Sequence, residues 1–144
     1  MKKVLIAGAT GAMGQKAVDL VNSLAGFEIT AALAPTLTKE NVADFHLASS
    51  VHPYQTLDEI EDGVADIWID FTLPSAVYQN VKFALEHEMR PIVGTTGLTD
   101  EQQADLVRLS EEKQVGGLIA ANFGMSAVLL MKFAQEAAKY FPDV

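Results

Sequence analysis

Three glycines near the N-terminus have the spacing of a phosphate-binding turn. They lie at positions i, i+3 and i+6 of one short segment, Gly8-Ala9-Thr10-Gly11-Ala12-Met13-Gly14. Glycines at these positions allow a sharp turn, a close approach of the backbone to a ligand, and tight packing of a helix on a sheet. The chemistry that this spacing favours is binding of an anion, such as the pyrophosphate of a dinucleotide, at the amino end of a helix.

The segments on either side of the glycines predict a turn between a strand and a helix. Residues 3–7 form an apolar run rich in branched side chains, typical of a buried strand, and residues 15–25 have helical spacing. A tight turn without a ligand is the alternative interpretation, and the flanking strand and helix favour the ligand-binding one. Residues 27–34 then predict a second, parallel strand reached by a right-handed crossover.

The second predicted strand lacks an acidic residue that dinucleotide-binding units commonly have. That residue holds the ribose hydroxyls and lies about 20 positions after the glycine loop. Ala34 stands there, and the residues that follow it are Pro35, Thr36, Thr38 and Lys39. Without a carboxylate to repel a ribose 2′-phosphate, we expect NADP to be tolerated at least as well as NAD. Lys39 also has the interpretation of a solvated loop lysine.

The rest of the chain alternates between strand and helix patterns. Residues 65–71, 91–93 and 117–121 predict three more strands, which makes five, with helices between and after them. This is typical of an α/β domain with a doubly wound parallel sheet of the Rossmann type, in three layers. The loops after strands one, three, four and five would open on one edge. A receiver-like fold shares the pattern but needs carboxylates after its first strand, where Gly8, Ala9 and Thr10 stand.

Other polar residues near strand ends have competing interpretations. A glycine and threonine stretch, whose hydroxyls could donate hydrogen bonds to a flat ring, follows residues 91–93: Gly94-Thr95-Thr96-Gly97. For Asp70, a carboxylate bonded to nearby backbone N–H groups is favoured over a catalytic one. His46 and His52 lack a third ligand at convincing spacing, so we predict no metal site. The final helix, with its apolar stripe, is expected to be half exposed or packed against a partner.

Composition and charge exclude several classes of protein. The 144 residues are 49% hydrophobic and 20% charged, which suits one globular domain. No apolar run reaches the roughly 18 residues of a membrane span, and the N-terminus is a poor signal peptide, so we expect a cytoplasmic protein. There is no cysteine for disulfide or thiol chemistry. The net charge of -9 makes nucleic-acid binding unfavourable.

Four stretches together resemble one known family. In chain order they are Gly8-Ala9-Thr10-Gly11-Ala12-Met13-Gly14, Asp70-Phe71-Thr72-Leu73-Pro74, Val93-Gly94-Thr95-Thr96-Gly97 and Ala120-Ala121-Asn122-Phe123. Their order and distances look like the N-terminal half of bacterial dihydrodipicolinate reductase, and the resemblance runs through essentially all 144 residues. It implies hydride transfer from NADH or NADPH to 4-hydroxy-tetrahydrodipicolinate, in lysine and diaminopimelate biosynthesis.

The resemblance also implies a role for each stretch. The pyrophosphate would be cradled by Gly8, Ala9, Thr10, Gly11, Ala12 and Met13. Phe71 and Thr72 would contact the cofactor between its two ends. The nicotinamide region would be lined by Gly94, Thr95 and Thr96. The carboxamide side would be closed by Ala120, Ala121, Asn122 and Phe123.

This sequence departs from the family pattern in two ways. Ala12 stands where an arginine is frequent, Thr10 where a glycine is frequent, and Ala34 where an acidic ribose ligand is usual. The family's catalytic histidine and lysine, and the stretch that binds substrate carboxylates, belong to a second domain with no match here. We therefore expect residues 1–144 to be a dinucleotide-binding domain cut from a longer two-domain enzyme, inactive alone and homo-oligomeric at full length.

Two other functions stay open at this point. A stand-alone NAD(P)-binding sensor would use the last helix to contact a partner. A complete short-chain reductase would need a tyrosine and a lysine one helical turn apart as its proton donor. Tyr78 and Lys82 have that spacing, but they precede the fourth predicted strand and are better interpreted as a solvated helix face.

Overall fold

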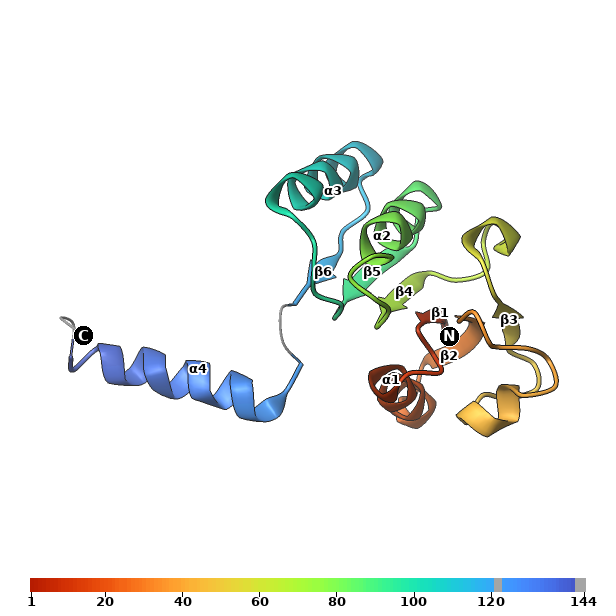
Figure 1. The fold of residues 1–144 in the computed structure, drawn as a ribbon, viewed down its shortest axis with the longest axis horizontal. Helices are drawn as coiled ribbons and strands as arrows, with labels where there is room; N and C mark the ends of the chain where they lie inside the picture. The colour runs from red at the N-terminus through yellow and green to blue at the C-terminus, as the bar shows by residue number, and fades with distance from the viewer. Residues whose placement is uncertain (121–122, 142–144) are drawn as a thin grey trace.

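A six-stranded parallel sheet forms the centre of the molecule (Figure 1). The computed structural model describes residues 1–120 and 123–141. The sheet order is β3-β2-β1-β4-β5-β6, with β1 (Lys2–Ala7), β2 (Phe27–Leu33), β3 (His52–Tyr54), β4 (Ile67–Asp70), β5 (Arg90–Val93) and β6 (Leu118–Ile119). The chain winds outward from β1 to β3, returns to β4, and winds outward again to β6. This is the doubly wound arrangement that the sequence predicts.

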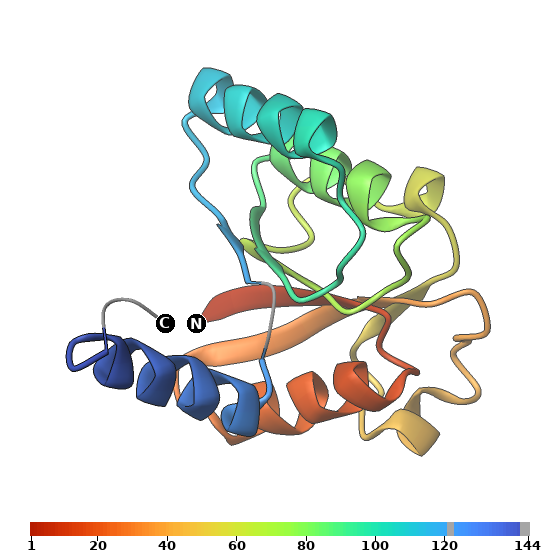
Figure 2. The same cartoon turned by 60° about the vertical axis from the view of Figure 1, so that its left-hand side comes forward.

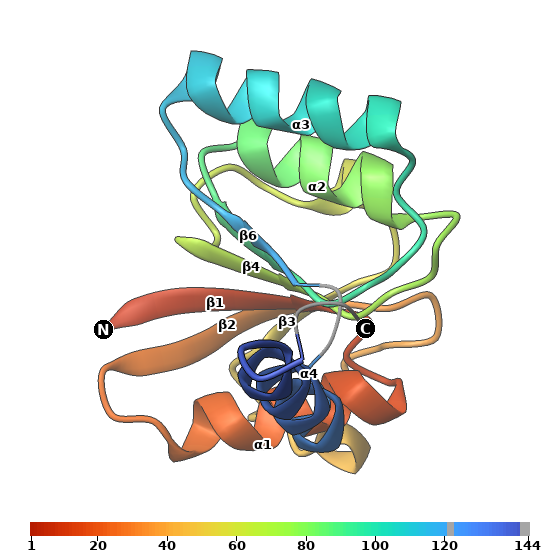
Figure 3. The same ribbon diagram turned by 90° about the vertical axis from the view of Figure 1, so that its left-hand side faces the viewer.

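Helices cover the two faces of this sheet and give three layers (Figure 3). One face packs against α1 (Ala12–Ser23), and the other against α2 (Val77–Glu86) and α3 (Asp100–Lys113). Two single 3-10 turns, η1 (Val42–Phe45) and η2 (Leu57–Glu59), lie in the connections around β3. The three-layer α/β prediction is therefore confirmed.

The alternation of side chains along β1 explains why its sequence is an unbroken apolar run. Val4 and Ile6 point to the α1 side, where they pack with Val18. Leu5 and Ala7 point to the opposite side, where they pack with Trp68. Because both faces of a central parallel strand are buried, every position needs an apolar residue.

The prediction of five strands is wrong, because it omits β3. This strand has three residues, pairs with β2 at one edge of the sheet, and contains Pro53. Proline cannot donate to a ladder, so it normally argues against a central strand, but an edge strand tolerates it. A capping box at Thr56 begins the 3-10 turn η2 that follows β3.

The last helix, α4 (Met125–Ala138), stands away from the three layers in Figure 1, although it overlaps α1 in the view of Figure 2. None of its residues is buried, and Leu130 and Phe133 are more than 60% exposed. The expectation that α4 is half exposed is therefore wrong, because none of its residues is buried by the rest of this chain. The alternative, that α4 packs against a partner, stays a prediction. Among the described residues, no helix combines the length and the apolar character needed to span a membrane.

Candidate functional site

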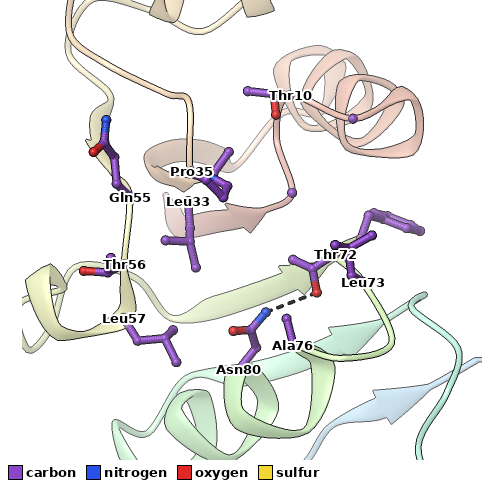
Figure 4. A pocket seen from close by; sticks show the side chains of 14 residues that line it. Thr10, Leu33, Pro35, Gln55, Thr56, Leu57, Thr72, Leu73, Ala76 and Asn80 are labelled. Carbon is purple, nitrogen blue, oxygen red and sulfur yellow. Dashed lines mark hydrogen bonds between the residues drawn. The ribbon is translucent and has the colours of Figure 1, made fainter.

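The loops after β1, β2, β3 and β4 surround a cleft of about 400 Å³ at the carboxyl edge of the sheet. Figure 4 shows Thr10 and Pro35 across the cleft from Thr72 and Asn80. The full lining is Gly8, Thr10, Gly11, Leu33, Ala34, Pro35, Gln55, Thr56, Leu57, Phe71, Thr72, Leu73, Ala76 and Asn80. In a doubly wound sheet, this edge near the reversal of strand order is where ligands bind.

A second cleft of about 360 Å³ adjoins the first, because the two share Gly11, Phe71 and Thr72. Its remaining lining is Ala12, Met13, Pro74, Gly94, Thr95 and Thr96. The structure thus brings together three of the four stretches that the sequence singled out. The two clefts therefore adjoin at the glycine loop and at the loop after β4.

Packing fixes two of the three glycines in the loop. Gly8 has φ +80°, and a Cβ built on it would lie 2.1 Å from the carbonyl oxygen of Phe71. A Cβ on Gly14 would lie 1.9 Å from the carbonyl oxygen of Gly8. Both positions therefore exclude every side chain, because backbone atoms already occupy the space. A Cβ on Gly11 would meet only the Gly8 oxygen, at 3.4 Å, an ordinary contact.

The amino end of α1 faces both clefts. Gly11 is its N-cap residue, no described side chain caps the helix, and its first turn has no acidic residue. The first-turn N–H groups of Ala12, Met13 and Gly14 have no acceptor within a helix. They present donors and the positive end of the helix dipole to the clefts, which suits a phosphate.

No charged side chain lines either cleft in the described part of the chain. An anion bound there would be held by backbone N–H groups and hydroxyls. Ala34 and Pro35 line the cleft beyond β2 without a carboxylate. The nearby Glu59 carboxylate is engaged elsewhere, because it accepts hydrogen bonds from the backbone N–H groups of Gln55 at 2.8 Å and Thr56 at 3.4 Å.

Asp70 is fully buried at the end of β4. Its carboxylate accepts hydrogen bonds from the Thr72 backbone N–H at 3.2 Å, the Thr72 hydroxyl at 2.7 Å and the Thr95 hydroxyl at 2.7 Å. It also accepts from Trp68 Nε1 at 3.0 Å and Asn80 Nδ2 at 3.1 Å. The favoured interpretation, a structural carboxylate, fits, although most of its donors are side chains and not backbone N–H groups.

The hydroxyl of Thr95 is engaged in hydrogen bonds within the protein. Thr95 is 8% exposed, its hydroxyl donates to Asp70, and its oxygen accepts the Thr72 backbone N–H at 2.8 Å. The expectation that both hydroxyls of the Gly94–Gly97 stretch donate to a ring is therefore corrected. Thr96, which is exposed and lines the second cleft, keeps that capacity.

The remaining predicted residues lie at different depths. Ala9 is buried in the core, and its carbonyl oxygen accepts a hydrogen bond from Gln15. Ala120 continues the β6 pairing through its N–H to Val93. Phe123 packs edge-on against Phe71 with ring centroids 5.3 Å apart. Ala121 and Asn122 lie outside the described residues.

Several lining residues were missed by the sequence analysis, chiefly Gln55, Thr56 and Leu57. They follow β3, the strand that the sequence did not predict. The rule that loops at the carboxyl ends of parallel strands gather at one edge would have selected them, had β3 been recognised. Asn80 was missed because it lies inside a helix, and its role depends on Thr72 and Asp70.

The alternative catalytic pair lies away from the glycine loop. Tyr78 and Lys82 line a separate surface hollow between α2 and α3. The Tyr78 hydroxyl donates to Asp105 at 2.7 Å, and this hydrogen bond raises the pKa of Tyr78. A short-chain reductase needs the opposite arrangement, a tyrosine made acidic beside the cofactor. Lys39 is exposed in its loop.

The described histidines take no part in either cleft. His46 contacts Asp19 through Nδ1 at 2.8 Å, and the His52 ring packs on Tyr54 with centroids 4.5 Å apart. The third, His87, stacks on Phe83 with centroids 4.0 Å apart. Within residues 1–120 and 123–141, no group of three or more His, Asp or Glu side chains is placed to hold a metal ion.

A doubly wound parallel sheet with a glycine loop on its first turn defines a Rossmann-type domain. The family model described as "Dihydrodipicolinate reductase, N-terminus" matches residues 2–123. The 4-hydroxy-tetrahydrodipicolinate reductases of Lactobacillus helveticus and Lactobacillus acidophilus are 64% and 63% identical over 143 residues, each alignment covering 99% of this chain and 54% of the relative. The chain belongs to the dihydrodipicolinate reductase family.

A solved structure agrees with this assignment. Dipicolinate-bound dihydrodipicolinate reductase from Paenisporosarcina sp. TG-14 superposes with a TM-score of 0.82 at 34% identity, covering 99% of this chain and 56% of that one. The chain thus spans about half the length of the relatives it matches.

Proposed function

We propose that this chain is a dinucleotide-binding domain that holds NADPH or NADH for a reductase. The observation that carries the proposal is the glycine loop, whose helix end opens at the point where the two clefts meet. The first-turn N–H groups of α1 would bind the pyrophosphate there. The adenosine would extend toward Pro35 and Gln55, and the nicotinamide toward Gly94 and Thr96.

The residues of the second cleft suit a flat, weakly polar ring. Phe71 and Met13 provide apolar surface, and Thr96 provides a free hydroxyl. When bound, reduced nicotinamide supplies a hydride. The part of this chain is then to orient the ring and exclude water, because neither cleft contains a described side chain that could supply the accompanying proton.

The reaction proposed for the full-length protein is reduction of 4-hydroxy-tetrahydrodipicolinate in lysine and diaminopimelate biosynthesis, in the cytoplasm. This follows the named relatives, which are about twice as long. A second domain would bring the substrate site and the proton donor, so residues 1–144 alone are inactive. No nucleic acid or membrane is involved, and the full-length protein is a homo-oligomer.

Exposed apolar surface on this chain supports the proposal that a second domain packs against it. An apolar groove of about 500 Å³ lies between α1 and Phe123, with Ile67, Ile69 and Ile92 among its lining residues. The apolar residues of α4 are exposed as well. A monomeric soluble domain rarely leaves such continuous apolar surface in water, so both features fit covering by a second domain.

Binding of the cofactor is tested by titrating NADPH and NADH into the purified chain and following dihydronicotinamide fluorescence. We expect saturable binding of both below the millimolar range. ADP-ribose, which keeps the pyrophosphate but lacks nicotinamide, should compete. Absence of saturable binding for both dinucleotides would remove the proposal.

A second candidate is a sensor module that signals through α4. The observation in its favour is that α4 is helical yet unpacked, and so available to a partner. Size-exclusion chromatography with and without NADPH separates the two functions. A sensor changes its association state on binding, whereas a reductase domain binds without such a change.

A further inference from the structure

Asp70 links the two loops that form the wall of the second cleft. Its Oδ1 accepts from the hydroxyl of Thr72, on the loop after β4, and from the hydroxyl of Thr95, on the loop after β5. Its Oδ2 accepts from Trp68 and from Asn80 of α2. One buried carboxylate therefore joins two strand ends and a helix.

The Asp70 carboxylate also fixes the direction of the hydrogen bonds around it. Because both threonine hydroxyls donate to the carboxylate, their oxygens are left as acceptors. Thr95 Oγ1 accepts the backbone N–H of Thr72 at 2.8 Å, and Thr72 Oγ1 accepts from Asn80 Nδ2 at 3.1 Å. Every buried side-chain nitrogen and oxygen among the described residues has a partner, so this network is complete.

The network determines where the backbone of the second cleft lies. The Thr72 N–H reaches across to Thr95, and the Gly94 N–H donates to the Asp70 carbonyl at 2.9 Å. Phe71 and Gly94, which line the cleft, are the chain neighbours of Thr72 and Thr95. A change in the network would therefore move the surface against which we place the nicotinamide.

Asp70 is not itself placed to touch a ligand. Its exposed fraction is 0%, and five hydrogen bonds from four residues occupy its two oxygens. We propose that Asp70 is a positioning residue that holds the loops after β4 and β5 in the geometry that binds the nicotinamide end of the dinucleotide. This inference rests on the proposed function, and it predicts an effect confined to one end of the ligand.

The test compares two ligands on Asp70→Asn. NADPH carries nicotinamide, and 2′-phospho-ADP-ribose has the same adenosine and pyrophosphate without it. The amide of asparagine has the shape of the carboxylate. Its NH₂ group would replace one of the two oxygens, both of which now accept hydrogen bonds, so it would face donor groups and those hydrogen bonds would be lost. We expect the affinity of Asp70→Asn for NADPH to fall about tenfold or more, and that for 2′-phospho-ADP-ribose to stay within about twofold. Equal losses for the two ligands, or no loss, would overturn the inference.

A matched pair of variants at Thr95 provides a second test. This test settles the question in the event that Asp70→Asn does not fold. Thr95→Ser keeps the hydroxyl that donates to Asp70, and Thr95→Val keeps the shape without it. We expect Thr95→Ser to keep more of the NADPH affinity than Thr95→Val, and the loss in Thr95→Val to be confined to the nicotinamide end. If Thr95→Val binds NADPH as Thr95→Ser does, Asp70 does not position the cleft. If the unmodified chain binds neither ligand, the proposed function fails first and this inference with it.

Discussion

The ring of Phe71 fills the space that a side chain at position 94 would need. A Cβ built on Gly94 would lie 2.2 Å from Phe71 Cε1. The same ring also meets Phe123 edge-on, with centroids 5.3 Å apart. Gly94 is thus required by the contact between two neighbouring loops, and Phe71 sets the shape of both clefts, whose linings it joins.

The first prediction concerns this contact. Gly94→Ala should destabilise the chain by about 1–3 kcal/mol, because the new methyl group overlaps an aromatic ring whose rotation is limited by packing. Urea unfolding followed by circular dichroism measures the change. In a Phe71→Leu background the same substitution should cost less than about 1 kcal/mol. Equal costs in the two backgrounds would show that the ring is not what excludes a side chain at position 94.

The second prediction compares Gly14, which packing requires, with Gly11, which we propose lies against the bound pyrophosphate. Gly14→Ala should destabilise by at least about 2 kcal/mol, because its Cβ would lie 1.9 Å from the Gly8 carbonyl oxygen. Gly11→Ala should change stability by no more than about 1 kcal/mol. Gly11 lines both clefts, so an added methyl group should crowd the place proposed for the pyrophosphate and lower NADPH affinity about tenfold or more. Thermal unfolding and fluorescence titration of both variants provide the measurements.

Each of the two glycine variants, Gly11→Ala and Gly14→Ala, has its own contradicting outcome. If Gly11→Ala binds NADPH as tightly as the unmodified chain, the pyrophosphate does not lie over the loop. If Gly14→Ala unfolds at the same temperature as the unmodified chain, the close approach of α1 to Gly8 is not rigid.

The glycine loop could be predicted from the sequence because its geometry is local. Strand, glycine spacing and helix lie within residues 3–25, and each constrains the next. β3 could not, because three residues containing Pro53 carry no strand pattern, and only pairing with β2 makes them a strand. The partners of Asp70 were also beyond reach, since Thr95 lies 25 positions away and approaches only when β4 pairs with β5. The helical pattern of α4 was visible, but the sequence alone could not show which surface would cover it.

The third prediction concerns the choice between NADPH and NADH. Pro35 is exposed and lines the first cleft just beyond β2, where no described carboxylate is present. Pro35→Asp would place a negative charge near the proposed position of the ribose 2′-phosphate. We expect this variant to lower the affinity for NADPH relative to that for NADH by about tenfold. The reason is repulsion between the new carboxylate and the 2′-phosphate in a cleft that is partly shielded from water.

Pro35→Asn is the matched control for the charge. It removes the same ring and adds a side chain of the same shape, so the ratio of NADPH to NADH affinity should stay within about twofold of that of the unmodified chain. If the two variants have the same ratio, the adenosine ribose does not lie beside residue 35.

The fourth prediction concerns pH and the contact between α2 and α3. The hydrogen bond from the Tyr78 hydroxyl, followed by that from Arg108, lowers the pKa of Asp105. A carboxyl whose folded pKa is lowered stabilises the fold above its unfolded pKa of about 4, and that stabilisation is lost as the pH falls through the folded value. The same hydrogen bond raises the pKa of Tyr78, so its contribution is lost again as the pH rises above about 10.

Comparison with Tyr78→Phe isolates this effect. The variant should be less stable than the unmodified chain between about pH 5 and pH 9. The difference should shrink toward pH 3, because a carboxyl in the unfolded chain, with a pKa of about 4, is then protonated. Urea unfolding at pH 3 and pH 7 measures both values. A difference of the same size at both pH values would assign it to packing of the hydroxyl and not to its bond with the carboxylate.

The last prediction concerns α4. No residue of this helix is buried, so it contributes little to the folding of the three layers. A chain ending at Phe123 should keep its melting temperature within about 3 °C. Leu106→Ala is the positive control, because it removes a side chain of α3 that is only 2% exposed. It should destabilise the shortened chain by about 2–4 kcal/mol and so show that the assay detects lost packing. The shortened chain should also associate less at high concentration, because it lacks the exposed apolar side chains of α4. A large drop in its melting temperature would mean that α4 packs on the domain in solution, and the surface proposed to meet a second domain would then already be occupied.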